Sequence, residues 1–156
     1  SVCDQFVQQS DVMATFAEIL GARLPADAGE DSVSLLSLLE GASHPVRLSG
    51  VSASIGGVPA FRHGSWKYIP APGSGGWGKG GDQSQPVQLY NLADDLGETR
   101  NLAAAMPEKV AEMKALLEKL ITDGRSTPGQ PQKNDVEVVR FPKPAAPKAK
   151  AVKKAK

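Results

Sequence analysis

The sequence predicts an α+β fold, in which a small antiparallel β-sheet packs against one helix near the carboxyl end. Two observations lead to this prediction. Short runs of strand-favouring residues, separated by glycine turns, extend from residue 46 to residue 92. A stretch whose apolar residues recur at helical spacing then covers residues 107–123. A chain of 156 residues is long enough to bury a core around these elements.

Two helical segments are expected before the sheet. A helix over about residues 11–20 is predicted because its apolar residues form one stripe, with Ser10 or Asp11 as its cap and Gly21 at its end. The stripe consists of Val12, Met13, Phe16, Ile19 and Leu20. A group of leucines predicts one or two further helical turns over about residues 33–40, pressed into a core and too short to stand alone.

The strands are expected in three segments. Residues 46–58 read as a β-like run that ends in a glycine turn. Residues 61–69 predict a hairpin that reverses at His63 and Gly64. A glycine-rich segment, residues 71–86, predicts a long loop, after which residues 87–92 form the last strand.

The final helix carries the clearest signals. Pro107 suits a first helical position, Glu108 complements the dipole in the first turn, and Gly124 ends the helix. Its apolar stripe is Val110, Met113, Leu116, Leu117, Leu120 and Ile121. Each large side chain buried from this stripe contributes about 1.5–3 kcal/mol, so the helix should hold the sheet in place.

The net charge of +1 conceals an asymmetry, because seven basic residues and no acid follow from Arg140 onward. Lys, Ala and Pro dominate this end, so residues 125–156 are predicted to be an extended tail and residues 136–156 to be disordered. Such a tail could bind polyanions. No aromatic or arginine interleaves its lysines, so a solvated end is favoured and nucleic acid is not the expected partner.

No stretch of eighteen apolar residues exists, so no membrane partner is expected. The single cysteine, Cys3, leaves the redox compartment undetermined. The chain begins with Ser1 and no basic-then-apolar leader follows, so it is expected to be a trimmed product or a fragment.

Five segments, in this order, resemble the carboxyl-terminal portion of a bacterial arylsulfatase, from the sulfatase family of the alkaline-phosphatase-like superfamily. The most telling residues are the Trp66 and Lys67 pair, Glu98, and the Asn101 and Leu102 pair. The segments are residues 11–21, 31–39, 61–69, 89–102 and 108–123. One departure is that several bacterial relatives carry histidines where this chain has Ser52, Ala53 and Ser54.

The resemblance implies a division into three parts. Residues 1–45 would complete the edge of a larger α/β catalytic domain, residues 46–124 would form a carboxyl-terminal subdomain, and residues 125–156 would be the tail. It also implies that the full enzyme hydrolyses sulfate esters of aryl or carbohydrate type, and that it is periplasmic or secreted. The expected residues at the rim of its substrate cleft are Trp77, Lys79 and His63.

The chemistry of the family is expected elsewhere. Sulfatases use a formylglycine made from a Cys/Ser-x-Pro-x-Arg motif, together with a calcium ion. Cys3 is followed by Asp4, Gln5 and Phe6, which is not that motif. No catalytic residue, metal ligand or cofactor is therefore predicted in this segment, and the chain alone is expected to be inactive.

Two alternatives remain. Asp94, Asp95 and Glu98 could hold a cation, although a turn rich in acids is the favoured interpretation. The chain could also be a separate, non-catalytic binding module derived from a sulfatase.

Overall fold

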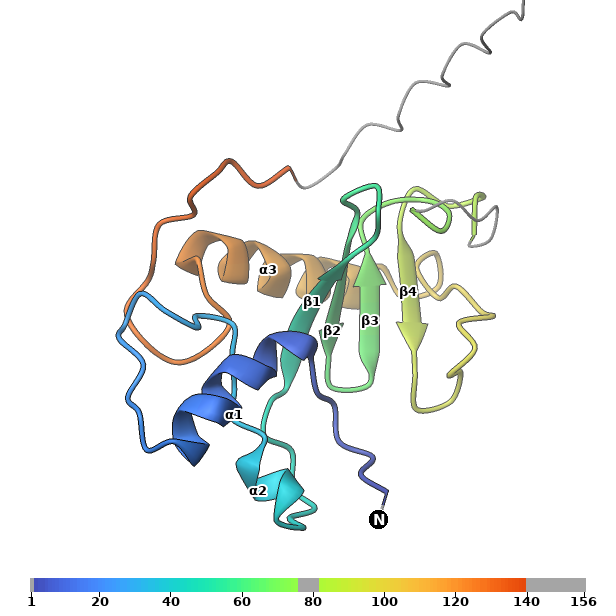
Figure 1. Cartoon of the computed structure of the whole chain (residues 1–156). Coiled ribbons are helices and arrows are strands. Elements are labelled where there is room, and N and C mark those ends of the chain that lie inside the picture. The colour runs from blue at the N-terminus through green and yellow to red at the C-terminus, as the bar shows by residue number, and fades with distance from the viewer. Residues whose placement is uncertain (1, 76–81, 140–156) are drawn as a thin grey trace, which may run out of the picture.

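The computed structural model of this chain describes residues 2–75 and 82–139. Within these residues, one four-stranded sheet is preceded by two short helices and followed by a long one (Figure 1). The short helices are α1 (Val12–Ile19), which a 3₁₀ turn (Gln9–Asp11) introduces, and α2 (Leu36–Leu39). The long helix is α3 (Pro107–Asp123). The predicted α+β fold is confirmed.

The four strands form a simple meander. They are β1 (Ser49–Ala53), β2 (Pro59–His63), β3 (Trp66–Ile69) and β4 (Gln88–Asn91). Neighbours in sequence are neighbours in the sheet, and each strand is antiparallel to the next. β1 is shorter than the predicted run because the Ser54 N–H donates to the Val58 carbonyl, which closes the turn into β2.

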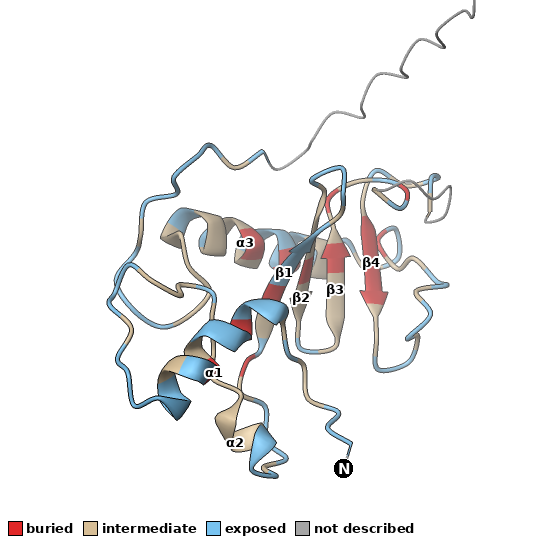
Figure 2. Cartoon of the chain, viewed as in Figure 1, coloured by how far each residue is buried: buried red, intermediate tan, exposed pale blue. Residues whose placement is uncertain are grey.

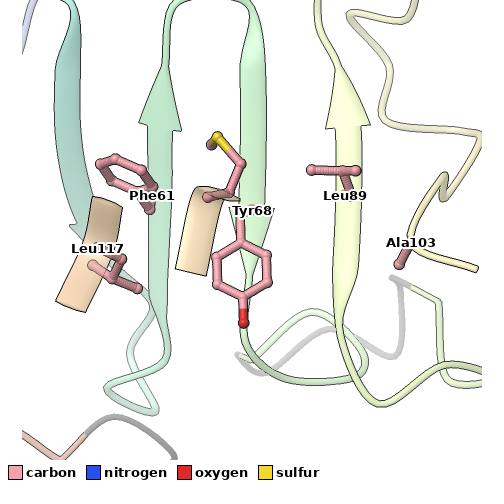
Figure 3. Close-up of a cluster of buried hydrophobic side chains, with 6 residues drawn as sticks. Phe61, Tyr68, Leu89, Ala103 and Leu117 are labelled. Atoms are coloured by element: carbon pink, nitrogen blue, oxygen red, sulfur yellow. The ribbon is translucent and has the colours of Figure 1, made fainter. Parts of the chain in front are cut away.

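Helix α3 covers one face of this sheet (Figure 1). Phe61, Tyr68 and Leu89 stand opposite one another in the register of β2, β3 and β4, and none is more than 1% exposed. Figure 3 shows them side by side, with Leu117 of α3 next to Phe61. Met113 and Leu117 are 0% and 4% exposed, so the predicted stripe of α3 forms the core with the sheet.

Glycines end the helices as the sequence predicts, but the hairpin reverses one residue later than predicted, because His63 is still part of β2 and pairs with Trp66. Gly21, after the C-cap Leu20 of α1, and Gly124, directly after α3, adopt positive φ angles of 64° and 62°. Gly64, with φ of 58°, forms the reversal between β2 and β3. A side chain with a Cβ atom adopts this left-handed conformation only at a cost, which is why glycine stands at these ends.

Asn101 closes the outer edge of β4. Its Oδ1 accepts the Leu89 N–H at 3.0 Å, and its Nδ2 donates to the Val87 carbonyl at 3.1 Å. The Leu102 N–H then donates to the Leu89 carbonyl at 2.8 Å. One side chain and one backbone group thus occupy the place of a fifth strand at this edge, where unpaired backbone groups would otherwise be exposed.

A buried ion pair joins the segment before the sheet to the helices. The Arg47 guanidinium lies 3.1 Å from Asp11 Oδ1, and the two side chains are 2% and 0% exposed. Asp11 also accepts backbone N–H groups from Gln8 and Val33. The side chain of Asp11 makes no capping hydrogen bond to the amides of α1. Its contacts instead hold the segment before the sheet against the amino-terminal region.

The apolar stripe of α1 faces outward. Its exposed fractions range from 45% for Val12 to 79% for Leu20, with Phe16 at 60%. Figure 2 shows most of α1 as exposed surface. The leucines of α2 are only partly buried, and Leu39 is 70% exposed, so the expectation that this turn is pressed into a core is wrong for the described residues.

Candidate functional site on the open face of the sheet

The face of the sheet turned away from α3 carries a shallow pocket of about 440 Å³. Alternation along the strands places Lys67 and Tyr90 on this face, opposite to Tyr68 and Leu89. Lys67 pairs with Tyr90 in the β3–β4 register, and Ile69 pairs with Gln88. The polar side chains in the pocket lining thus come in part from β3 and from the edge strand β4.

Lys67 and Glu98 form the charged part of this pocket. The Lys67 Nζ lies 2.6 Å and 2.8 Å from the two carboxylate oxygens of Glu98. Their side chains are 25% and 32% exposed, so the pair is partly solvated. Glu98 adopts a φ of 53°, the left-handed conformation that non-glycine residues rarely take. The turn after β4 therefore carries strain at the residue whose carboxylate reaches Lys67.

Gln88 organises the base of the glycine-rich loop. Its side chain is 1% exposed, and its Nε2 donates to the carbonyls of Ala71 and Gly73 at 2.7 Å and 2.8 Å. Its Oε1 accepts the Tyr90 hydroxyl at 2.7 Å. The Gly73 N–H donates to the Asp82 carbonyl, which closes the loop across its base. These hydrogen bonds therefore fix the two ends of the loop where it joins the sheet.

Asp82 connects the base of this loop to the closed edge of β4. Its Oδ2 accepts Asn101 Nδ2 at 2.7 Å, and its Oδ1 accepts the N–H and the hydroxyl of Ser84. The Ser84 hydroxyl is the largest cause that lowers the pKa of Asp82, followed by the Ser84 N–H and Asn101. The carboxylate is accordingly held in its charged form.

Burial raises the pKa of Tyr90, and the carboxylates of Glu98, Asp82 and Asp95 raise it further. The phenol therefore stays neutral and donates its hydrogen bond to Gln88. Among the described residues that line this pocket there is no histidine, cysteine or aspartate, and Glu98 is already paired with Lys67. The arrangement can position a polar group.

The predicted rim residues are not all described. Trp77 and Lys79 lie outside the described residues. His63 lies at the end of β2 that leads into the 64–65 turn, with its Nδ1 2.7 Å from the Ser49 hydroxyl and its ring stacked on Phe61. It therefore sits on the α3 side, whereas the glycine-rich loop leaves the opposite end of β3. The role of these three residues stays a prediction.

The acidic turn is held by its own hydrogen bonds. Asp95 accepts the backbone N–H groups of Thr99 and Arg100, which are the largest causes that lower its pKa. Asp94 accepts Asn91 Nδ2 at 2.7 Å. Within residues 2–75 and 82–139, no group of three or more His, Cys, Asp and Glu is arranged to hold a metal ion. The acidic side chains of this turn are thus engaged within it, and Cys3, an exposed thiol, is not followed by the x-Pro-x-Arg part of the formylglycine motif.

The sequence analysis missed Gln88 and Arg47, and it named Asn101 only as part of the resemblance, without its role at the edge of β4. Gln88 and Asn101 are polar residues whose importance lies in backbone groups that the fold brings to them. Arg47 stands in a loop with no local signal of burial. Only Asn101 could have been found in advance, since it belongs to one of the segments that resemble sulfatases.

The comparisons with known proteins agree on one class. No family model matches the chain. A curated relative from Bacteroides thetaiotaomicron, an N-acetylgalactosamine-6-O-sulfatase, is 37% identical over 119 residues, which cover 73% of this chain and 23% of the relative.

None of the described helices is long and apolar enough to cross a bilayer.

Solved structures agree with this relative. A 6S-sulf structure from a Bacteroides thetaiotaomicron locus for the metabolism of multiple glycosaminoglycans is 34% identical, with a TM-score of 0.59 over 70% of this chain and 24% of that one. A 2-O GAG sulfatase is 24% identical with a TM-score of 0.51, covering 72% of this chain and 24% of that one, and supports the fold alone.

The fold and these matches define an α+β segment that is similar to part of a sulfatase. The chain is a sulfatase homologue, as the sequence predicts, and it spans about a quarter of the length of the relatives it matches.

Proposed function

We propose that this chain is the carboxyl-terminal, scaffolding part of an enzyme that hydrolyses sulfate esters of carbohydrates. In this proposal α1 docks on the remainder of the enzyme, and the open face of the sheet and its glycine-rich loop form one wall of the substrate cleft. The formylglycine and the calcium ion belong to the remainder. The chain by itself has no hydrolytic activity.

The exposed stripe of α1 carries this proposal. Phe16, Ile19 and Leu20 are between 53% and 79% exposed, although they form a regular apolar face. Contiguous apolar surface of this kind marks an interface. The sulfatases matched here are about four times as long as the matched segment, since it covers 23% and 24% of them. The part of those sulfatases that the match does not cover, about three-quarters of their length, thus corresponds to the natural partner of this face.

The substrate class is proposed from two features. The named relative is an N-acetylgalactosamine-6-O-sulfatase, and the open face of this chain presents the Lys67 ammonium and polar side chains around a pocket. The Lys67 ammonium is paired with the Glu98 carboxylate, so this pocket offers hydrogen-bond donors and acceptors for sugar hydroxyls, and the sulfate class follows from the named relative.

The test has two arms. The 156-residue chain is assayed alone with 4-nitrophenyl sulfate and N-acetylgalactosamine 6-sulfate, and no sulfate release above a heat-denatured control is expected. The chain is then co-expressed with the polypeptide encoded directly upstream of it, and turnover is expected to appear. Turnover by the isolated chain, or a co-expressed pair that stays inactive and does not associate, would contradict the proposal.

Two phenylalanines provide a matched pair for the docking face. Phe16→Ala should change the stability of the isolated chain by no more than about 0.5 kcal/mol, because exposed surface substitutions have small effects. Phe61→Ala, in the core, should cost about 3–5 kcal/mol. In the co-expressed pair, Phe16→Ala should weaken association. If Phe16→Ala leaves that association unchanged while Phe61→Ala behaves as expected, α1 is not the docking face.

A further inference from the structure

A mainly apolar groove, whose lining also includes the charged Asp31 and Arg125, lies beside β1, the strand at the edge opposite to β4. The groove has a volume of about 370 Å³. One wall is β1, with Val51 and Ala53, and the floor is the last part of α3, with Leu120 and Ile121. The other wall is the segment after α3, with Val138 and Val139.

The outer edge of β1 is open. The Leu48 carbonyl accepts the Gly64 N–H and the Ser54 N–H donates to the Val58 carbonyl, so alternation turns the backbone groups of Ser49, Val51 and Ala53 away from β2. Among the described residues, these outward groups have one hydrogen-bond partner, the Gln8 side-chain amide on the Val51 carbonyl at 3.1 Å. Asn101 closes the other edge of the sheet with two hydrogen bonds, whereas among the described residues Gln8 covers this edge at the Val51 carbonyl alone.

The core is also incomplete on this side. Helix α3 packs on β2 and β3, while Val51, which stands on the helix side of β1, is 41% exposed. Leu120 and Ile121 are only partly buried, although they belong to the apolar stripe of α3. An extended segment between β1 and α3 would cover these side chains and satisfy the outward amides, as a bound strand does in β-augmentation.

The chain itself supplies such a segment. Residues 135–139 read Asp-Val-Glu-Val-Val, a β-branched run in which valine alternates with an acid. Val136 and Val139 are 75% and 63% exposed. Asn134, directly before the run, donates from its Nδ2 to the Ile121 carbonyl at 2.7 Å. The run is therefore tethered at the groove that its own residues Val138 and Val139 already line.

We infer that residues 135–139 add to the edge of β1 as a fifth strand and place Val136 and Val138 in the groove. Alternation then directs the side chain of Glu137 to the opposite face. This strand would add to the sheet beside β1, outside the sequential order of the meander, and cover the exposed edge, which is a liability for any sheet protein. The inference does not depend on the proposed sulfatase role.

Hydrogen exchange on the 156-residue chain tests the inference, with two truncations as a matched pair. In the full chain and in residues 1–139, the amides of Val51 and Ala53 should exchange at least about tenfold more slowly than in residues 1–134. The Ser52 amide is the internal control, because its position in the register turns it toward β2, and it should stay protected in all three. If the Leu89 amide exchanges equally slowly in all three proteins, each truncation is folded.

Point variants of the full chain keep the test valid if a truncation does not fold. Val138→Asp places a carboxylate in the apolar groove and should raise exchange at Val51 and Ala53 to the level of residues 1–134, whereas Glu137→Gln should leave it unchanged. Fast exchange at Val51 in the full chain, or protection that persists in residues 1–134, would overturn the inference. Protection that rises with protein concentration together with a doubled mass would overturn it in favour of pairing between two copies.

Discussion

The Lys67 ammonium lies between the two carboxylate oxygens of Glu98, at 2.6 Å and 2.8 Å, and Glu98 holds this position in a left-handed backbone conformation. The two residues belong to different segments of the sulfatase resemblance, the Trp-Lys pair and the acidic turn. The contact joins the hairpin to the turn that follows β4. It also sets two effects against each other, since the ion pair stabilises the turn and the backbone strain destabilises it.

Glu98 can be used to separate these two effects. Glu98→Ala loses the ion pair and keeps the strain, so it should cost about 0.5–1 kcal/mol, the value of a partly exposed pair. Glu98→Gly also loses the pair but relieves a strain of about 1 kcal/mol, so its stability should be close to that of the parent. Urea unfolding measures both. A glycine variant no more stable than the alanine variant would show that the strain is absent in solution.

Among the charged residues, Arg47 should be one of those whose substitution lowers the stability most. Arg47→Met leaves the Asp11 carboxylate buried without its cation, and breaking a buried pair in this way costs about 3–5 kcal/mol. Lys109→Met, which removes the more exposed pair with Glu112, should stay within about 1 kcal/mol of the parent. Calorimetry measures both variants. Similar melting temperatures for the two would mean that the Asp11 carboxylate reaches solvent.

Asn101 is expected to hold the edge of the sheet. Asn101→Ala leaves the Leu89 N–H without its acceptor, and an unsatisfied buried donor costs about 1–3 kcal/mol. Asn91→Ala is the matched control, because the Asn91 side chain makes exposed contacts to Asp94 and Ala93, and it should cost about 0.5 kcal/mol or less. Chemical unfolding checks the difference. If both variants lost the same free energy of unfolding, the hydrogen bonds of Asn101 at the edge of β4 would not be the cause.

Asp95 should contribute to acid sensitivity. Hydrogen bonds from Thr99 and Arg100 lower its pKa in the folded chain. Its stabilising contribution is therefore complete above the unfolded-state pKa of about 4 and is lost as the pH falls through the lower folded-state value. Asp95→Asn should flatten the fall in melting temperature below about pH 4. Asp94→Asn is the comparison, and an equal flattening in that variant would contradict the assignment.

Local rules predict much of the fold. The stripe of α3, Pro107 at its start and Gly124 at its end belong to one continuous stretch of sequence, so spacing and backbone preferences decide them. The same holds for the hairpin at Gly64, whose φ of 58° follows from its position in a two-residue turn. Resemblance to a family then correctly supplied the class of protein.

The site was less predictable because its contacts join distant segments. Asp11 reads as a helix cap until Arg47 is placed beside it, and Gln88 reads as a polar strand residue until Ala71 and Gly73 turn their carbonyls toward it. The exposed stripe of α1 has a different cause. Periodicity predicts that a face is apolar, but it does not say which polypeptide covers that face.

The strictly sequential meander also bears on how the chain acquires its structure. Each strand pairs with the strand that precedes it, so the sheet assembles from contacts of short sequence separation, which favours rapid folding. Asp11 and Arg47, by contrast, meet across a long intervening stretch. We therefore expect residues 49–123 to collapse first and the α1 region to consolidate afterwards, leaving its apolar stripe available to a partner while the polypeptide matures.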